Sequence, residues 1–195
     1  MLVYVMCALA CVIAYVLGGI PSAYLIGKAF GNVDIRTQGS GNVGSTNVAR
    51  TLGAKAGILT LVSDILKAVV AVLIGKLLIG VVGAGAIETT APGGVYDWCA
   101  ALVYLAVILG HMFTPFLHFH GGKGIASGFG GAVVLMPWAG LSLWGPFLIF
   151  AVSTRYVSVG SIAGALSLPI FANLFYQPSM AFTVIVCIVS VLVIW

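Results

Sequence analysis

Residues 57–82 read GILTLVSDILKAVVAVLIGKLLIGVV, an apolar run that only three charged side chains interrupt. An α-helix needs about 20 consecutive, mainly apolar residues to cross the hydrocarbon core of a bilayer. The run is long enough to do so, and we predict a transmembrane helix here. The other apolar runs of the chain lie at 2–30, 98–113, 125–138, 141–152, 157–175 and 180–195.

The composition of the whole chain supports this prediction. Of its 195 residues, 62% are apolar and only 6% are charged, and the mean hydropathy is +1.21. A soluble domain carries about 25% charged residues, so the composition argues against a soluble helical bundle. We predict a single all-α integral membrane domain over residues 1–195, with the lipid bilayer as its surroundings and no nucleic-acid partner.

We predict seven transmembrane helices, of which the fourth (125–138) and the fifth (141–152) are short for a bilayer. A turn at 137–140 is expected to separate these two. With seven crossings, the polar segments of the chain all fall on one side of the membrane. These segments are 34–55, 114–124 and 153–158.

The distribution of charge indicates which side faces the cytoplasm. The segment 82–97, on the opposite side, carries Glu88 and Asp97 and no basic residue. Cytoplasmic loops are rich in Lys and Arg, so we predict that the N-terminus lies outside and that Trp195 ends at the cytoplasmic face. Residues 1–19 lack a basic start and a cleavage site, and we interpret them as a retained spanning helix. The basic residues on the cytoplasmic side are Arg36, Arg50, Lys55, Lys123 and Arg155.

The segment 39–50, GSGNVGSTNVAR, is polar and rich in glycine within an otherwise apolar chain. Its first six residues match G-x-G-x-x-G, but the strand that a dinucleotide site requires is absent from the sequence pattern. Glycines let backbone N–H groups approach an anion, and an arginine fork such as Arg50 binds phosphate oxygens in pairs. We predict a phosphate-binding loop; the alternative is a flexible solvated loop.

A second glycine-rich segment, HFHGGKG at 118–124, places Lys123 at the entrance of an apolar run. It is not a Walker A loop, because that motif would need Gly at 117 and Ser or Thr at 124. A lysine framed by glycines at a helix N-terminus is nevertheless suited to an anion. The alternative is a lysine that extends along the membrane interface.

Further polar groups lie within or beside the apolar runs. Asp64 and Lys67 are three residues apart on one helix face and can form an ion pair, which is either functional or purely structural. Arg155, Ser158 and Ser161 offer a cation and hydroxyls on the cytoplasmic side, or an interfacial anchor. Small residues at four-residue spacing, Gly53/Gly57 and Gly160/Gly164, predict close helix packing.

The residues that common acyl-transfer and metal mechanisms require are missing. His118 and His120 have no carboxylate or thiol nearby, so no metal site is expected, and we predict no cofactor. No H-x-x-x-x-D pair and no G-x-S-x-G motif is present. This favours an enzyme that positions phosphate-bearing reactants. The alternative, a transporter for a phosphorylated solute, should line a path to both faces, whereas the cations here gather at one.

Four motifs, in order, resemble those of the bacterial acyl-phosphate:glycerol-3-phosphate acyltransferases, the PlsY family: GSGNVGSTNVAR, SDILKA, LGHMFTPFLHFHGGKG and TRYVSVGS. The resemblance implies transfer of a fatty acyl group from acyl phosphate to the 1-hydroxyl of sn-glycerol 3-phosphate, which gives lysophosphatidic acid and phosphate. It also implies a role in phospholipid biosynthesis at the bacterial cytoplasmic (inner) membrane. A soluble enzyme that makes acyl phosphate would be the metabolic partner.

The resemblance also implies roles for individual residues. Ser40, Arg50 and Lys123 are expected to be catalytic. Asp64 and Lys67 are expected to hold the residues that contact the substrate, without contacting it themselves. The family generally has Gly where this chain has Ala68 and a basic residue where it has His120. It also continues into a cytoplasmic tail, so we expect this chain either to be truncated at Trp195 or to work without the tail. The expected substrate-binding residues are Gly39, Gly41, Asn42, Thr46, Asn47, His111, Gly121, Gly122, Gly124, Arg155, Ser158 and Ser161.

Overall fold

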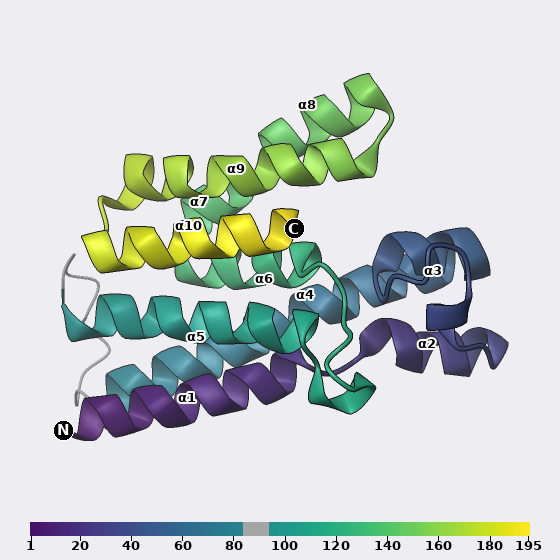
Figure 1. Ribbon diagram of the computed structural model, residues 1–195. Helices are drawn as coiled ribbons and strands as arrows, with labels where there is room; N and C mark the ends of the chain where they lie inside the picture. The colour runs from purple at the N-terminus through teal and green to yellow at the C-terminus, as the bar shows by residue number, and fades with distance from the viewer. Residues whose placement is uncertain (84–93) are drawn as a thin grey trace.

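The computed structural model describes residues 1–83 and 94–195, and every regular element in these ranges is helical (Figure 1). The predicted all-α class is therefore confirmed. The first half contains α1 (Leu2–Gly18), α2 (Ser22–Gly31), η1 (Ile35–Thr37), α3 (Ser45–Leu52), α4 (Ala54–Leu77) and the π-helical turn η2 (Leu78–Gly83). The second half contains α5 (Val95–Met112), η3 (Pro115–Leu117), α6 (Ile125–Leu135), α7 (Pro137–Ser142), α8 (Trp144–Thr154), α9 (Val157–Tyr176) and α10 (Met180–Ile194).

Four stretches in the described part of the chain are long and apolar enough to cross a membrane. The helices α6 and α10 are apolar but shorter. Most of the fifth predicted run lies in α8, and its first two residues end α7. The predicted shortness of the fourth and fifth runs is thus seen, while the count of seven crossings stays a prediction. Glu88, which the orientation argument uses, lies outside the described residues. The four stretches are Leu2–Gly31, Ala54–Val82, Val95–Leu117 and Val157–Tyr176.

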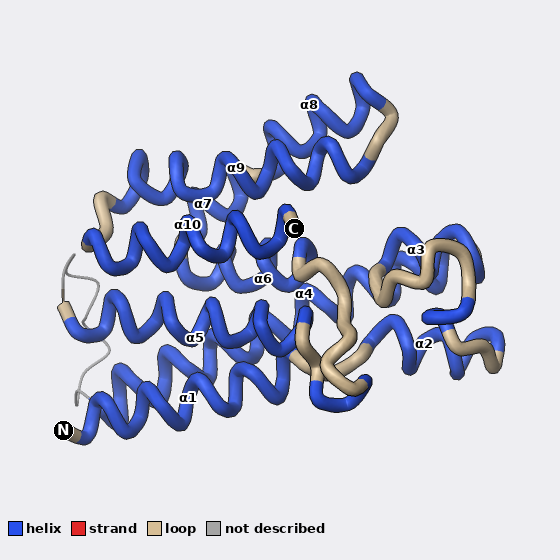
Figure 2. The backbone as a smooth tube through the Cα atoms, in the orientation of Figure 1, coloured by secondary structure: helices blue, strands red, loops and turns tan. Residues whose placement is uncertain are grey.

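The long helices lie side by side in a bundle, and α5 occupies its interior (Figure 1). Its buried side chains, among them Tyr104 and Ile108, pack against α1, α4, α6 and α10. The helices α2 and α3 extend beyond one end of the bundle. Figure 2 shows that the irregular segments between α2 and α3 and between α5 and α6 gather at this same end. The fold therefore brings the two glycine-rich segments to one end of the molecule.

Three breaks between helices lie at prolines, and the sequence analysis placed none of the three correctly. The run 2–30 is two helices, because Pro21 has no N–H to continue the ladder and restricts the residue before it. The predicted turn at 137–140 is wrong: these residues begin α7, with Pro137 in the first turn, and the chain turns at Met136 instead. Pro146 cannot donate to the carbonyl of Ser142, which explains why α7 and α8 are separate helices.

Glycines permit the closest helix contacts. A Cβ on Gly57 would collide with Ala49 of α3, and one on Gly160 would collide with the Phe147 carbonyl of α8. The predicted close packing is confirmed at these two positions. It is wrong at Gly53, which has a φ of +89° and open space around it, and which acts as the joint between α3 and α4. Gly164 makes only ordinary contacts.

The crossing of α1 and α5 depends on a further pair of glycines. A Cβ on Gly110 would collide with the Tyr15 carbonyl oxygen, and one on Gly18 would collide with the Val107 carbonyl oxygen. We predict that Gly110→Ala lowers the stability of the protein by about 1–3 kcal/mol, because the obstacle, the Tyr15 carbonyl, is a backbone group that cannot rotate away. Thermal unfolding in detergent measures this, with Gly145→Ala, which meets nothing within 4 Å, as the control. Equal melting temperatures for the two variants would contradict it.

Candidate functional site

The first glycine-rich segment is held together by one buried side chain, Asn47 of α3. Its amide nitrogen donates to the carbonyls of Ile35 (3.3 Å), Gln38 (3.0 Å) and Asn42 (3.0 Å), and its amide oxygen accepts from the Ser40 N–H at 3.0 Å. Both the amide nitrogen and the amide oxygen of Asn47 therefore bond to backbone groups of the protein. Asn47, which we expected to bind substrate, is instead the residue that shapes the loop.

Only the first half of the segment 39–50 is a loop, because α3 begins at Ser45. The residue before it, Gly44, supplies no capping side chain, so the first N–H groups of α3 have no capping acceptor among the described residues. An uncapped helix N-terminus attracts anions. Thr46 and Arg50, both exposed, belong to this helix.

Arg36, at the same end of the molecule, is not available as a free cation. Its guanidinium forms an ion pair with Asp34 at 2.6 Å and lies 5.3 Å from the centre of the Tyr24 ring. The hydrogen bonds from Arg36 lower the pKa of Asp34 to about 2. The carboxylate therefore remains charged and keeps Arg36 in place across the physiological pH range.

The second glycine-rich segment lies against the end of α5. The Gly121 N–H donates to the Met112 carbonyl at 2.8 Å, and the Gly122 N–H donates to the His111 carbonyl at 3.2 Å. These amides are already paired, which corrects the expectation that they point at an anion. Gly124, with a φ of +80°, precedes α6 and offers no capping side chain. The available N–H groups therefore belong to the first turn of α6, beside Lys123.

Gly122 is the point where the two glycine-rich segments meet. A Cβ there would collide with His111 Nε2 and would stand 2.8 Å from the Val43 carbonyl oxygen. Only glycine leaves room for both the His111 ring and the Val43 carbonyl. Gly122, which we expected to bind phosphate, therefore has a packing role: it lets the second glycine-rich segment approach Val43 of the first.

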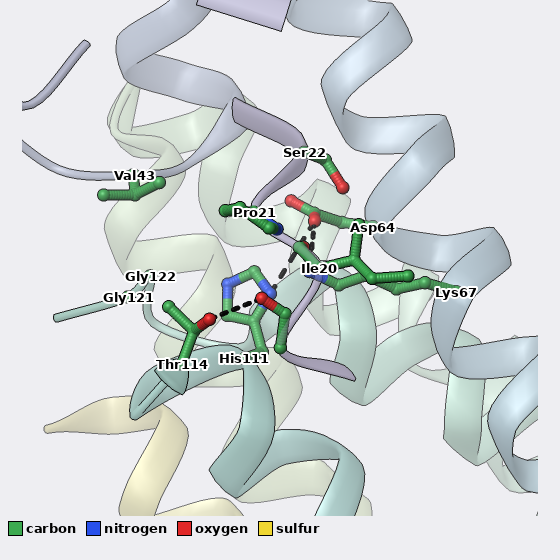
Figure 3. A pocket seen from close by; sticks show the side chains of 11 residues that line it. Ile20, Pro21, Ser22, Val43, Asp64, Lys67, His111, Thr114, Gly121 and Gly122 are labelled. Atoms are coloured by element: carbon green, nitrogen blue, oxygen red, sulfur yellow. Dashed lines mark hydrogen bonds and ion pairs between the residues drawn. The ribbon is translucent and has the colours of Figure 1, made fainter. Parts of the chain in front are cut away.

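Behind this contact lies a buried ion pair (Figure 3). Lys67 Nζ is 2.8 Å from Asp64 Oδ1, and these side chains are only 6% and 3% exposed. The same ammonium donates to the Ile20 carbonyl at 2.7 Å, in the break between α1 and α2. The predicted Asp64–Lys67 pair is therefore present, and it joins α4 to the end of α1.

His111 of α5 and Ser127 of α6 extend the network. His111 Nδ1 lies 3.1 Å from the Ser127 hydroxyl and 3.7 Å from Asp64 Oδ1. The Ser127 hydroxyl donates to the Asp64 carbonyl at 3.2 Å. Thr114 donates to the Gly19 carbonyl nearby. The sequence analysis missed Ser127 and Thr114; a hydroxyl at the start of an apolar run was the signal available for Ser127.

Two neighbouring hollows open at this end of the bundle. A small polar cavity of about 10 Å³ lies over Asp64, Lys67, His111 and Gly122, and Figure 3 shows its lining. A groove of about 500 Å³ lies between residues 34–43 and 117–121. Val43 and Gly121 line both hollows. Of the residues expected at the site, those that line a hollow are Gly41, Asp64, Lys67, His111, Gly121 and Gly122.

The three residues expected to be catalytic, Ser40, Arg50 and Lys123, are exposed. They belong to α3, to the segment before it and to the segment before α6, and these parts of the chain lie at one end of the molecule (Figure 2). Neither cation has an ion-pair partner within residues 1–83 and 94–195. The structure does not bring Arg155, Ser158 and Ser161 to the hollows. They lie where α8 meets α9, a connection that stands apart from α3 in Figure 1, and the Ser161 hydroxyl donates to the Val157 carbonyl.

The described residues contain no cluster of three side chains able to hold a metal ion. A family model for glycerol-3-phosphate acyltransferase matches residues 8–195. The chain belongs to this acyltransferase family. The resemblance inferred from the four motifs is therefore confirmed.

Individual members of the acyltransferase family agree over most of their length. A glycerol-3-phosphate acyltransferase from Clostridioides difficile is 42% identical over 160 residues, which are 82% of this chain and 74% of the relative. One from Geotalea daltonii is 40% identical over 180 residues, or 92% of this chain and 84% of the relative. The crystal structure of PlsY, an integral membrane glycerol 3-phosphate acyltransferase in its glycerol 3-phosphate form, has a TM-score of 0.81 and 33% identity, covering 96% of this chain and 86% of that one.

The role of Asn47 in this family member can be tested by substitution. We predict that Asn47→Asp abolishes acyl transfer, because a carboxylate cannot donate to the carbonyls of Ile35, Gln38 and Asn42 and would instead face these oxygens with a negative charge. Asn32→Asp, a change of the same kind at an exposed residue that ends α2 and lines neither hollow, is the control. Enzyme turnover and protection of residues 38–47 from proteolysis should fall together for Asn47→Asp. An Asn47→Asp variant that retained both would contradict this role.

Proposed function

We propose that this protein is a glycerol-3-phosphate acyltransferase that transfers a fatty acyl group from acyl phosphate to the 1-hydroxyl of sn-glycerol 3-phosphate. The products are lysophosphatidic acid and inorganic phosphate. The observation that carries the proposal is the family match over residues 8–195, together with the meeting of both glycine-rich segments at Gly122. A related structure in a lysophosphatidic acid form supports it.

The groups suited to two phosphates lie at one end of the bundle. The N-termini of α3 and α6 both lack a side-chain cap. Lys123 lies two residues before α6, and Arg50 lies in the last turn of the short helix α3. We propose that these cations, with the Ser40 hydroxyl, hold the phosphates of donor and acceptor. Two dianionic reactants repel one another, so they meet only where fixed positive charge and dipoles offset that repulsion.

The proposed chemistry needs no side-chain nucleophile. The oxygen of the 1-hydroxyl bonds to the acyl carbonyl carbon, and the bond from that carbon to the phosphate oxygen breaks. The hydroxyl proton passes to a phosphate oxygen of the acyl phosphate, so the leaving group departs as hydrogen phosphate. Acyl phosphate is a mixed anhydride, and its carbonyl is activated before it binds. The protein supplies orientation and charge stabilisation.

We propose a location in the bacterial cytoplasmic membrane with seven crossings and the site facing the cytoplasm. The N-terminus and the glycine-rich segments lie at opposite ends of the bundle (Figure 1). The exposed cations Arg50, Lys55 and Lys123 gather at the end of the glycine-rich segments, as the positive-inside rule expects of the cytoplasmic side. A soluble enzyme that produces acyl phosphate would supply the donor.

Turnover by the purified protein tests the proposal. The wild-type protein in detergent should form lysophosphatidic acid from glycerol 3-phosphate and acyl phosphate, and do so faster than with acyl-CoA or acyl carrier protein as donor. Arg50→Ala and Lys123→Ala should each lower kcat about 10²–10³-fold, as expected when a transition-state charge partner is removed. Lys55→Ala, which removes an exposed cation from the start of α4, serves as the control.

The possible results separate the alternatives. No lysophosphatidic acid with any donor would overturn the function. Product formed only from acyl-CoA or acyl carrier protein would overturn the choice of donor. An Arg50→Ala or Lys123→Ala variant as active as Lys55→Ala would overturn the proposed site.

A further inference from the structure

The network of Asp64, Lys67, His111 and Ser127 joins four separate parts of the chain. Asp64 and Lys67 belong to α4, His111 to α5 and Ser127 to α6, while Lys67 also bonds to the Ile20 carbonyl between α1 and α2. All four side chains are nearly or fully buried. None of them lines the groove between residues 34–43 and 117–121, although Asp64, Lys67 and His111 line the small cavity beside it.

The hydrogen bonds assign the orientation of the His111 ring. The Ser127 hydroxyl donates its single hydrogen to the Asp64 carbonyl, and it therefore accepts from His111 Nδ1. This places the hydrogen of the neutral ring on Nδ1, which also faces the Asp64 carboxylate at 3.7 Å. The other nitrogen, Nε2, lies beside Gly122, at the small cavity that His111 helps to line.

The backbone of His111 reaches the glycine-rich segment directly. Its carbonyl accepts the Gly122 N–H, and the next carbonyl, of Met112, accepts the Gly121 N–H. The ring packs against Gly122 on the side of the Val43 carbonyl. Ser127 and Asp64 hold the His111 ring at its Nδ1. The His111 backbone in turn holds Gly122, and Lys123 is the next residue.

We infer that His111 and Ser127, held by the Asp64–Lys67 pair, are positioning residues that set the Gly121–Gly124 backbone and thereby aim Lys123 at the substrate phosphate. The inference rests on the proposed function for what Lys123 does. The placement of the backbone can be tested independently of turnover, because it concerns two amide hydrogen bonds.

Two substitutions of His111 test which of its two ring nitrogens matters for activity. Asparagine places its amide nitrogen near the former Nδ1 and retains the donor to Ser127, whereas glutamine extends toward the former Nε2 and does not. We expect His111→Gln to lower kcat about 10- to 100-fold, the effect of a small displacement of a catalytic group, with a smaller change in KM for glycerol 3-phosphate. His111→Asn should remain within about threefold of wild type, on the same physical basis.

Hydrogen exchange of the peptide that covers residues 118–124 provides the second measurement. Its Gly121 and Gly122 amides should exchange as slowly in His111→Asn as in wild type, and faster in His111→Gln. Ser127→Ala should also exchange faster and should lose activity. Its matched control is Ser190→Ala, which changes a buried serine of α10 whose hydroxyl donates to the Val186 carbonyl of the same helix.

Each outcome bears on the inference. Exchange and kcat in Ser127→Ala equal to those in Ser190→Ala would overturn it, as would a His111→Gln variant better than His111→Asn. If the His111 variants fail to fold, the serine pair alone decides. A wild-type protein that forms no product would overturn the proposed function, while the exchange data would still confirm or refute the positioning role.

Discussion

The arrangement of this protein depends on one buried ion pair, Asp64 with Lys67. A charged side chain inside a membrane protein is costly unless it is paired and hydrogen-bonded. Here the carboxylate and the ammonium are 2.8 Å apart, and the Ile20 carbonyl satisfies the ammonium further. The pair therefore fixes α4 against the break between α1 and α2, and His111 of α5 faces the same carboxylate. Helices from both halves of the chain therefore meet around this ion pair.

Glycines allow the close backbone contacts around this ion pair. Gly18 and Gly110 let α1 and α5 approach until backbone meets backbone, and Gly122 lets the second glycine-rich segment rest on His111 and Val43. None of these contacts tolerates a Cβ without displacement. The glycine-rich character of the site therefore has two origins. Some glycines free N–H groups at helix starts, and others permit close packing.

Much of this could be predicted from the sequence. The apolar runs and the low charge content identify a multi-pass helical membrane protein, and the spacing of Asp64 and Lys67 predicts their pairing. The roles of Asn47, Gly121 and Gly122 could not be predicted, because a polar or glycine residue beside a predicted phosphate site is equally suited to bind protein groups. Only the structure shows that their hydrogen-bonding groups are already used. Ser127 was missed because its partners are distant in sequence.

The central claim, that the Asp64–Lys67 pair holds the bundle and the site together, is tested most directly by comparing the thermal stability of Asp64→Asn, Lys67→Met and the double variant. Breaking a buried pair by removing one partner costs about 3–5 kcal/mol, because the other charge remains buried and unpaired. Each single variant should therefore melt well below wild type. The double variant should recover most of the loss, because no unpaired charge remains. A double variant as unstable as the sum of the two single changes would contradict the account.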